Sequence, residues 1–180
     1  MATAVILAGG RSHRMGSDKA VVDLHGKRLI DHVIERLSPQ VDRIMLSAGQ
    51  DYGTGLTIIG DADAFQGPVA GLFGIAEWLA ANEPACSHFL TVPVDGPFLP
   101  ADLARKLTAQ PDQVAIAQDE AGTHPTFANW TLAALDQARP SLPSAPSLHR
   151  LAKLTNARPV LWSGNQNFIN LNTPDDLKGY

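Results

Sequence analysis

The chain has 180 residues, the usual size of one domain, and 44% of them are hydrophobic, which suffices for a core and excludes a disordered protein. Its 14 lysines and arginines against 18 aspartates and glutamates give a net charge of −4, which excludes an overall basic surface for nucleic acid. The single cysteine, Cys86, excludes an internal disulfide, and we interpret it as structural. No stretch approaches the ~20 apolar residues of a membrane span and no basic leader is apparent, so we expect a cytoplasmic protein.

Short apolar runs alternate with stretches of helical periodicity. The runs predict buried strands at Ala4–Ala8, Ile44–Leu46, Leu56–Ile59, Phe89–Val94 and Val114–Ala117. Apolar residues at helical spacing predict helices over Leu29–Leu37, Val69–Leu79 and Ala101–Leu107. This alternation predicts one α/β domain over residues 1–180, with helices on both faces of a mostly parallel sheet. Such sheets bind ligands at the carboxyl ends of their strands, so function is expected in the loops after Ala8, Ala48, Ile59 and Val94.

The C-terminal third contains a segment rich in proline and serine. Residues 139–147 predict a mobile surface loop near the site, because too few residues follow for a second domain. A helix is expected over Ser147–Leu154. Thr173-Pro174-Asp175-Asp176 predicts the start of a short last helix, with a capping threonine and a proline in the first turn.

A glycine-rich, basic segment follows the first predicted strand: Leu7-Ala8-Gly9-Gly10-Arg11-Ser12-His13-Arg14-Met15-Gly16-Ser17-Asp18-Lys19. Tandem glycines allow close approach of the backbone to a ligand because they have no Cβ. Arg11, Arg14 and Lys19 bring the positive charge that a triphosphate needs. The spacing fits neither the P-loop nor the dinucleotide fingerprint. A glycine turn with a solvated basic surface is the alternative, but the whole segment favours phosphate binding.

Asp95 is the strongest metal candidate. It follows the apolar run Phe89–Val94, where a lone carboxylate is costly unless it meets a cation. Mg²⁺ is typically held by one or two carboxylates together with phosphate oxygens and waters. The alternative is a carboxylate that caps the next helix. We favour the metal.

Further segments, taken in chain order with the glycine-rich one, resemble a single family. They are Gly67-Pro68-Val69-Ala70-Gly71, Asp95-Gly96-Pro97-Phe98, His124-Pro125-Thr126 and Asn170-Leu171-Asn172-Thr173-Pro174-Asp175-Asp176-Leu177. The set resembles nucleotidyltransferases that activate a phosphorylated small molecule with a nucleoside triphosphate. Leu7-Ala8-Gly9-Gly10 is similar to the molybdenum cofactor guanylyltransferases in particular. The chain departs from that pattern at Ser47, where the family often has Asn, at Pro93, where it commonly has Cys, and at His149-Arg150, where relatives often have an earlier Arg.

The resemblance implies a Rossmann-like, three-layer α/β/α nucleotidyltransferase domain. It implies transfer of GMP from GTP to the terminal phosphate of molybdopterin, with Mg²⁺ held by Asp95 and with Lys19 and Arg14 on the leaving pyrophosphate. The nucleotide contacts that it implies are Leu7, Ala8, Gly9, Gly10, Arg11, Lys19, Ser47, Asp61, Gly67 and Asp95. Partners beyond GTP and the acceptor are expected to be transient, such as enzymes that insert molybdenum or use the product, with no nucleic acid and no membrane.

Several of these residues also have simpler interpretations. Asp61, taken alone, is more typical of a turn residue. His124 is held extended by the following proline and either touches the acceptor's phosphate or makes a structural hydrogen bond. Asn170 and Asn172 alternate along an extended run, so they share one face, either for acceptor recognition or as a β-turn pair.

Two other functions stay open at the level of sequence. The same chemistry with CTP or another small-molecule phosphate would use the same kind of loop. A non-catalytic nucleotide-binding or partner-docking module is the second alternative. The presence of both Lys19 and Asp95 argues for an enzyme.

Overall fold

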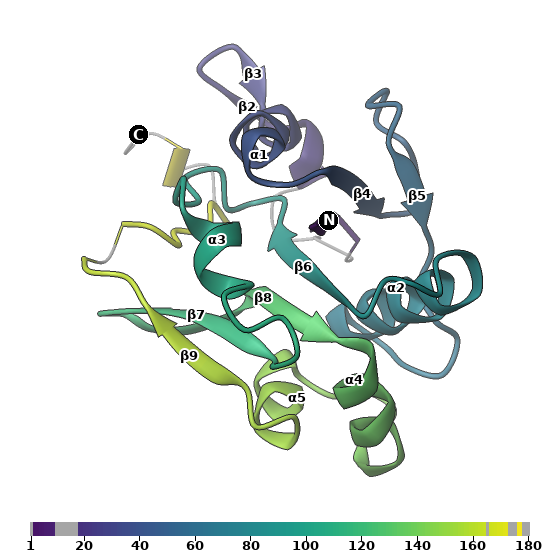
Figure 1. Ribbon diagram of the computed structural model, residues 1–180. Helices are drawn as coiled ribbons and strands as arrows, with labels where there is room; N and C mark the ends of the chain where they lie inside the picture. Colours follow the sequence, from purple (N-terminus) through teal and green to yellow (C-terminus); the bar gives the residue numbers. More distant parts are fainter. Residues whose placement is uncertain (1, 10–17, 165, 173–175, 178–180) are drawn as a thin grey trace.

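The computed structural model describes residues 2–9, 18–164, 166–172 and 176–177. A seven-stranded sheet forms the centre of the molecule, in the order β5–β4–β1–β6–β8–β7–β9 (Figure 1). The strands are β1 Thr3–Leu7, β4 Arg43–Ser47, β5 Thr57–Ile59, β6 His88–Pro93, β7 Ala115–Asp119, β8 Gly122–Thr131 and β9 Arg158–Leu161. Strand β8 is antiparallel to β6 and β7, and the other neighbours are parallel, which confirms the mostly parallel sheet.

Helices cover both faces of this sheet (Figure 1). Helices α1 (Leu29–Leu37) and α3 (Leu103–Leu107) pack on one face, and α2 (Pro68–Asn82), α4 (Leu132–Ala138) and α5 (Leu148–Leu154) pack on the other. Successive residues of β1 divide between the two cores, because strand side chains alternate: Ala4 and Ile6 face α1, and Val5 faces α2. The predicted three-layer α/β/α architecture is therefore confirmed.

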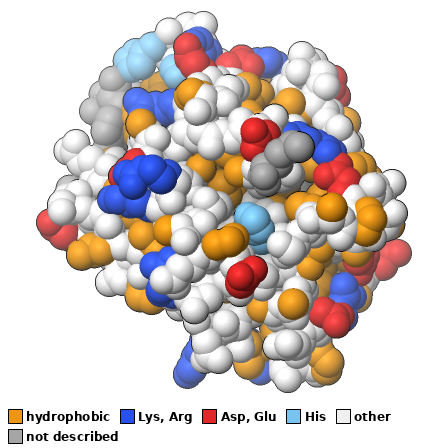
Figure 2. Space-filling model, in the orientation of Figure 1, with side chains coloured by type: hydrophobic (Ala, Val, Ile, Leu, Met, Phe, Trp, Pro, Cys, Tyr) orange, Lys and Arg blue, Asp and Glu red, His pale blue; other side chains and the backbone are white. Residues whose placement is uncertain are grey.

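Short elements complete the chain. They are the 3₁₀ turns η1 Lys19–Val21, η2 Ser38–Gln40 and η3 Arg139–Ser141, and the small hairpin of β2 Asp23–Leu24 and β3 Lys27–Arg28. Lysine, arginine and acidic side chains are all spread over the face shown in Figure 2. Within the described ranges, no helix has the length and apolar character needed to cross a membrane.

The predicted strands and helices occur, with shifted ends, but β8, β9 and α4 were not predicted. Strand β8 contains Pro125 and polar residues at its start, and β9 contains Pro159, so neither has the continuous apolar run of a buried parallel strand. Helix α3 begins at Leu103 rather than at Ala101. The predicted start of a last helix at Thr173 lies outside the described residues.

Segment 139–147 begins with η3 and continues as a turn over the surface. The carbonyl oxygen of Ser144 accepts a hydrogen bond from the backbone N–H of Gln66 at 2.8 Å. Helix α5 then begins after Ser147, whose Oγ accepts from the N–H of Arg150 at 3.2 Å, as a capping serine does. The segment thus contacts the loop that leads into α2.

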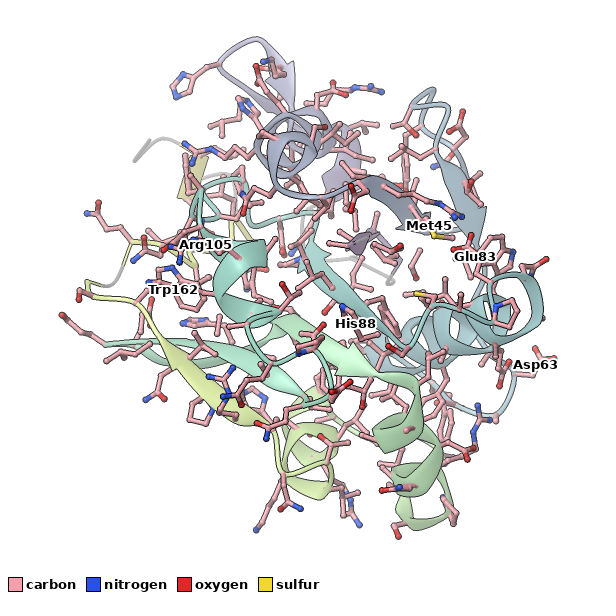
Figure 3. All side chains as sticks on the ribbon, viewed as in Figure 1. Met45, Asp63, Glu83, His88, Arg105 and Trp162 are labelled. Atoms are coloured by element: carbon pink, nitrogen blue, oxygen red, sulfur yellow. The ribbon has the colours of Figure 1, made fainter. Side chains whose placement is uncertain are left out.

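Trp162 ties the end of the edge strand β9 to α3. Its Nε1 donates to Asp102 Oδ1 at 2.7 Å, and Lys106 Nζ lies 4.6 Å from the centre of its ring. Figure 3 shows Trp162 beside Arg105 of α3. This contact fixes the chain just before the segment that carries Asn170 and Asn172.

Candidate active site

The parallel strands end at one edge of the sheet, and their hydrogen bonding continues beyond them. The N–H of Ala8 donates to Ser47 O at 3.0 Å, the N–H of Ala48 donates to Ile59 O at 3.3 Å, and the N–H of Val94 donates to Leu7 O at 3.0 Å. These bonds align the residues that follow β1, β4, β5 and β6. The predicted functional loops therefore meet at one edge, as the fold requires.

A pocket of about 760 Å³ opens at this edge, within the usual size of a small-molecule site. It is lined by Leu7, Gly9, Ser47, Asp61, Phe65, Gln66, Gly67, Pro68, Ala70 and Gly71. Half of these residues are predicted nucleotide contacts, namely Leu7, Gly9, Ser47, Asp61 and Gly67. The structure thus brings together residues that are far apart in the sequence.

Glycines at the start of α2 shape this pocket. Gly67 has a φ of 69°, a conformation that favours glycine, and it precedes Pro68 in the first turn of the helix. A Cβ on Gly71 would lie 2.6 Å from Ser47 Oγ and 3.2 Å from Asp61 Oδ1. Only glycine therefore leaves these two oxygens accessible beside the helix.

Lys19 forms the charged part of the site with Asp95. Its Nζ donates to Asp95 Oδ2 at 2.7 Å and to Asn172 Oδ1 at 2.5 Å. The side chains of Lys19 and Asp95 are each 15% exposed. The N–H of Leu171 donates to the carbonyl oxygen of Asp95 at 2.8 Å, which holds the Asn172 segment against the end of β6. Asn172, predicted for the acceptor, thus contacts the predicted nucleotide residue Lys19.

Asp18 anchors the turn that presents Lys19. Its Oδ1 accepts from the N–H of Ala20 at 3.1 Å, and its Oδ2 accepts from Tyr52 Oη at 2.6 Å and from Gln50 Nε2 at 3.2 Å. Burial, together with the bond to Asp18, raises the pKa of Tyr52, so the phenol keeps the proton that it donates. Tyr52 and Gln50 were not predicted, since they stand in a polar loop without a recognisable motif.

Asp95 does not cap a helix, because α3 begins later, after Asp102. Its carboxylate is a hard oxygen ligand of the kind that Mg²⁺ prefers. In the described part of the chain, no cluster of three or more His, Cys, Asp or Glu residues could hold a metal by itself. The residues fit an ion that is held by one carboxylate and completed by phosphate oxygens and waters.

His124 and Asn170, the other two predicted acceptor residues, make no contact with Asp95 that the described structure shows. His124 Nε2 bonds to Asp119 Oδ1 at 2.8 Å, and its ring centre is 5.0 Å from that of Phe168. The Oδ1 of Asn170 is buried and has no hydrogen-bond partner in the described structure. A buried acceptor of this kind usually meets a partner, so a bound ligand is a natural candidate for it.

Not every predicted residue is described by the structure, and not every residue of the pocket was predicted. Gly10, Arg11 and Arg14 lie outside the described residues. Phe65, which lines the pocket, was not predicted; its ring packs 4.6 Å from that of Phe73, and the guanidinium of Arg139 lies 4.5 Å from the Phe73 ring. The only signal in the sequence that could have indicated Phe65 is that an aromatic residue stands in the loop after Asp61.

The fold and the pocket define the class of the protein as an α/β nucleotidyltransferase. A crystal structure of molybdopterin-guanine dinucleotide biosynthesis protein A from Archaeoglobus fulgidus superposes with a TM-score of 0.72 at 21% identity, covering 98% of this chain and 95% of that one. A family model described as a MobA-like NTP transferase domain matches residues 4–160. The chain belongs to this MobA-like family, which confirms the resemblance predicted from the motifs.

Curated relatives agree with this assignment over nearly their full length. A molybdenum cofactor guanylyltransferase from Rhodopseudomonas palustris (strain BisB5) is 37% identical over 97% of this chain and 90% of its own length. Another from Rhizobium leguminosarum bv. trifolii is 39% identical over 96% of this chain and 88% of its own. The prediction that the protein is an enzyme of the nucleotidyltransferase class is confirmed.

Proposed function

We propose that this protein transfers GMP from GTP to the terminal phosphate of a molybdopterin-type acceptor and releases pyrophosphate. The observation that carries the proposal is the Lys19–Asp95 ion pair next to the pocket. Leu7 lines the pocket, and its carbonyl oxygen accepts a hydrogen bond from the backbone N–H of Val94, the residue before Asp95. A base bound in the pocket would therefore have its phosphates beside a lysine and a metal-binding carboxylate. We infer the acceptor from the names of the relatives, which this chain matches over nearly their full length.

The pocket suits the base and ribose of the nucleotide. Ser47 Oγ and Asp61 Oδ1 both face the space left by Gly71. A carboxylate is an acceptor for two donors, and guanine presents two adjacent donors, N1–H and the 2-amino group. Cytosine presents only its 4-amino group as a donor on its pairing edge. This difference favours GTP over CTP. Ser47, which also lines the pocket, stands where relatives often have Asn.

Lys19 and Asp95 would act on the phosphates. The ammonium of Lys19 has three N–H donors, of which Asp95 and Asn172 take two, so the third can donate to a phosphate oxygen. Asp95 would hold Mg²⁺, which supplies positive charge to the triphosphate when it is bound. A Mycobacterium tuberculosis protein of this fold, at a TM-score of 0.69, has been solved in complex with manganese. We propose Mg²⁺ as the ion here, with Arg14 and Arg11 adding charge from the glycine-rich segment.

No general base is needed, because the terminal phosphate of the acceptor is already a nucleophile. The protein's contribution is to position the two phosphates and to neutralise the charge that develops on the leaving pyrophosphate. His124, Asn170 and Asn172 are the proposed acceptor contacts. We place the reaction in the cytoplasm, and contacts with enzymes that insert molybdenum or use the product remain a prediction.

The decisive experiment incubates the full chain with Mg²⁺, molybdopterin and GTP labelled at the α-phosphate. The expected result is label in a pterin–guanine dinucleotide, with pyrophosphate released in equal amount. Binding of GTP without product and without pyrophosphate would support the non-catalytic module instead.

Thermal shift with GTP–Mg²⁺ and CTP–Mg²⁺ tests the base. A ligand at 100 times its dissociation constant adds about 2.7 kcal/mol to the free energy of unfolding, so selectivity appears directly as a difference in Tm. We expect a larger shift with GTP. Equal shifts would contradict the proposed reading of the base by Asp61.

A further inference from the structure

Asp119, at the end of β7, is a buried carboxylate that the proposed reaction does not use. The residue is 4% exposed and its side chain 1% exposed. Burial of a carboxylate is costly unless donors satisfy it. In the described structure its Oδ1 accepts from the N–H of Ala121 at 2.9 Å and from His124 Nε2 at 2.8 Å. Among the residues that the structure describes, His124 is therefore the only side chain that hydrogen-bonds to Asp119.

The β7–β8 hairpin creates this contact. Asp119 lies opposite Gly122 and His124 lies opposite Ala117, so the two side chains are diagonal neighbours on one face of the sheet. Gly122 has a φ of 134° and no side chain to stand between them. The contact is thus built into the register of the hairpin rather than made by a flexible surface residue.

The contact also fixes the imidazole. An ionised carboxylate only accepts hydrogen bonds, so Nε2 of His124 must carry the proton, and in the neutral ring Nδ1 is then unprotonated. The ring of Phe168 lies 5.0 Å away and is itself held by the rings of Phe127 at 5.0 Å and Trp162 at 5.2 Å. Position, tilt and tautomer of His124 are all constrained.

This fixed histidine lies on the edge of the sheet that carries Asp95. Strand β8 runs antiparallel to β6, with Ala128 opposite Thr91, so the start of β8 extends towards the residues that follow β6. The ring of Phe127 packs against the backbone of Gly96, where an added Cβ would lie 2.4 Å from Phe127 Cζ. The His124 side chain is 19% exposed, so part of it is accessible to a ligand.

We propose that Asp119 is a positioning residue, which holds Nε2–H of His124 so that Nδ1 is directed to the phosphate of the acceptor. The proposal rests on the acceptor assigned under the proposed function. In this arrangement the ring would lie between Asp119 and the incoming phosphate, and the negative charge of Asp119 would offset positive charge on an imidazole that donates from both nitrogens. Asp119 touches no substrate and acts through His124 alone.

The first test reads the tautomer without any substrate. The full chain is labelled with ¹⁵N-histidine and measured at about pH 8, where an ordinary imidazole with a pKa of ~6.5 is neutral, and the His124 signals are assigned by their loss in His124→Gln. The wild type should show the Nε2–H form. Asp119→Ala should show a mixture of tautomers, and Asp119→Asn should keep the Nε2–H form because the amide oxygen still accepts. A wild-type Nδ1–H form would overturn the proposal even if Asp119→Ala fails to fold.

The second test is kinetic. Asp119→Ala should raise the KM for the acceptor about tenfold, the scale of one hydrogen bond to a charged group, with the KM for GTP nearly unchanged. Its effect should not add to that of His124→Gln, because both remove the same contact. Glu120→Ala, which removes the neighbouring exposed carboxylate, is the matched control and should behave as wild type. Full additivity, or an equal rise in both KM values, would contradict the role of Asp119.

The two tests separate this inference from the proposed function. Absence of turnover with GTP and the acceptor would refute the reaction and with it the role of His124 towards the acceptor. The tautomer measurement would still decide whether Asp119 orients His124. An active enzyme with an unconstrained His124 would refute the inference alone.

Discussion

At the scale of single residues, the ammonium of Lys19 links the predicted metal ligand to the C-terminal asparagines. It contacts Asp95 and Asn172, which come from segments 76 and 153 residues further along the chain. Its charge would contact the triphosphate both in the ground state and on the leaving group. Substitution should therefore affect binding and turnover together.

Lys19→Met keeps most of the stem and removes the charge. We expect kcat/KM for GTP to fall about 10²-fold or more, by analogy with the loss of one charge-stabilising donor in other active sites. The control is Lys27→Met, which removes an exposed lysine paired with Glu35 and should cost little. A Lys19→Met enzyme with wild-type kcat/KM for GTP would refute the assignment.

Asp95→Asn removes one negative charge at nearly constant shape. We expect turnover with GTP–Mg²⁺ to fall by about 10²–10³-fold, because the ion loses its carboxylate. The ligand-free Tm should stay near that of the wild type, since Asp95 caps no helix and its carbonyl oxygen still accepts from Leu171. Asp136→Asn, at an exposed position of α4, is the control. A large loss of ligand-free stability would show that Asp95 is structural.

At the scale of elements, the packing of α2 against the segment after β5 places Asp61 in the pocket. The N–H of Ala62 donates to Ala70 O at 2.9 Å, and a Cβ on Gly74 would lie 2.1 Å from Gly60 O. The helix can approach this backbone only because position 74 has no side chain. The close approach thus sets the position of one wall of the pocket.

Gly74→Ala should therefore destabilise the protein by about 1–3 kcal/mol, the usual cost of overpacking. For a chain of this size, each kcal/mol corresponds to a fall in Tm of about 2–4 °C. The affinity for GTP should fall as well, because Asp61 moves with the segment. The matched control is Gly49→Ala, where an added Cβ meets nothing within 4 Å. A Gly74→Ala protein more stable than wild type, as helix propensity alone favours, would refute this account.

At the scale of the whole molecule, the free energy of unfolding should depend on pH in part because of His88, at the start of β6 (Figure 3). Burial lowers the pKa of His88 below its ordinary value. The unfolded chain then takes up a proton at a higher pH than the folded chain does. Stability from this group is therefore present above the ordinary pKa of ~6.5 and is lost as pH falls below it, towards the lowered pKa of the folded state.

His88→Gln should make the unfolding free energy less dependent on pH in that window. The measurement is urea denaturation at a series of pH values from about 7.5 downwards, across the ordinary pKa of ~6.5. His149→Gln, on the exposed side of α5, is the control and should keep the wild-type slope. An unchanged slope in His88→Gln would show that burial of this imidazole does not contribute.

Local sequence determined much of the architecture and of the chemistry. Apolar runs of strand length and the periodicity of α1 and α2 are local signals, because each element buries its own apolar face, so the layers were predicted correctly. The residue types of the glycine-rich segment likewise indicated phosphate binding, and its resemblance to a known family, together with that of the Asp95 motif, implied a nucleotidyltransferase. Such motifs are readable because the phosphate chemistry needs particular side chains next to one another.

Only the tertiary structure decided which distant residues meet. Strand β8 was missed because its antiparallel pairing depends on β6 and β7 rather than on its own apolar pattern. The contact of Asn172 with Lys19, the support of Asp18 by Tyr52 and the burial of Asp119 against His124 all join segments or registers that no spacing rule connects. They exist because the ends of parallel strands and one hairpin converge at a single edge of the sheet, and packing, not sequence proximity, brings those side chains together.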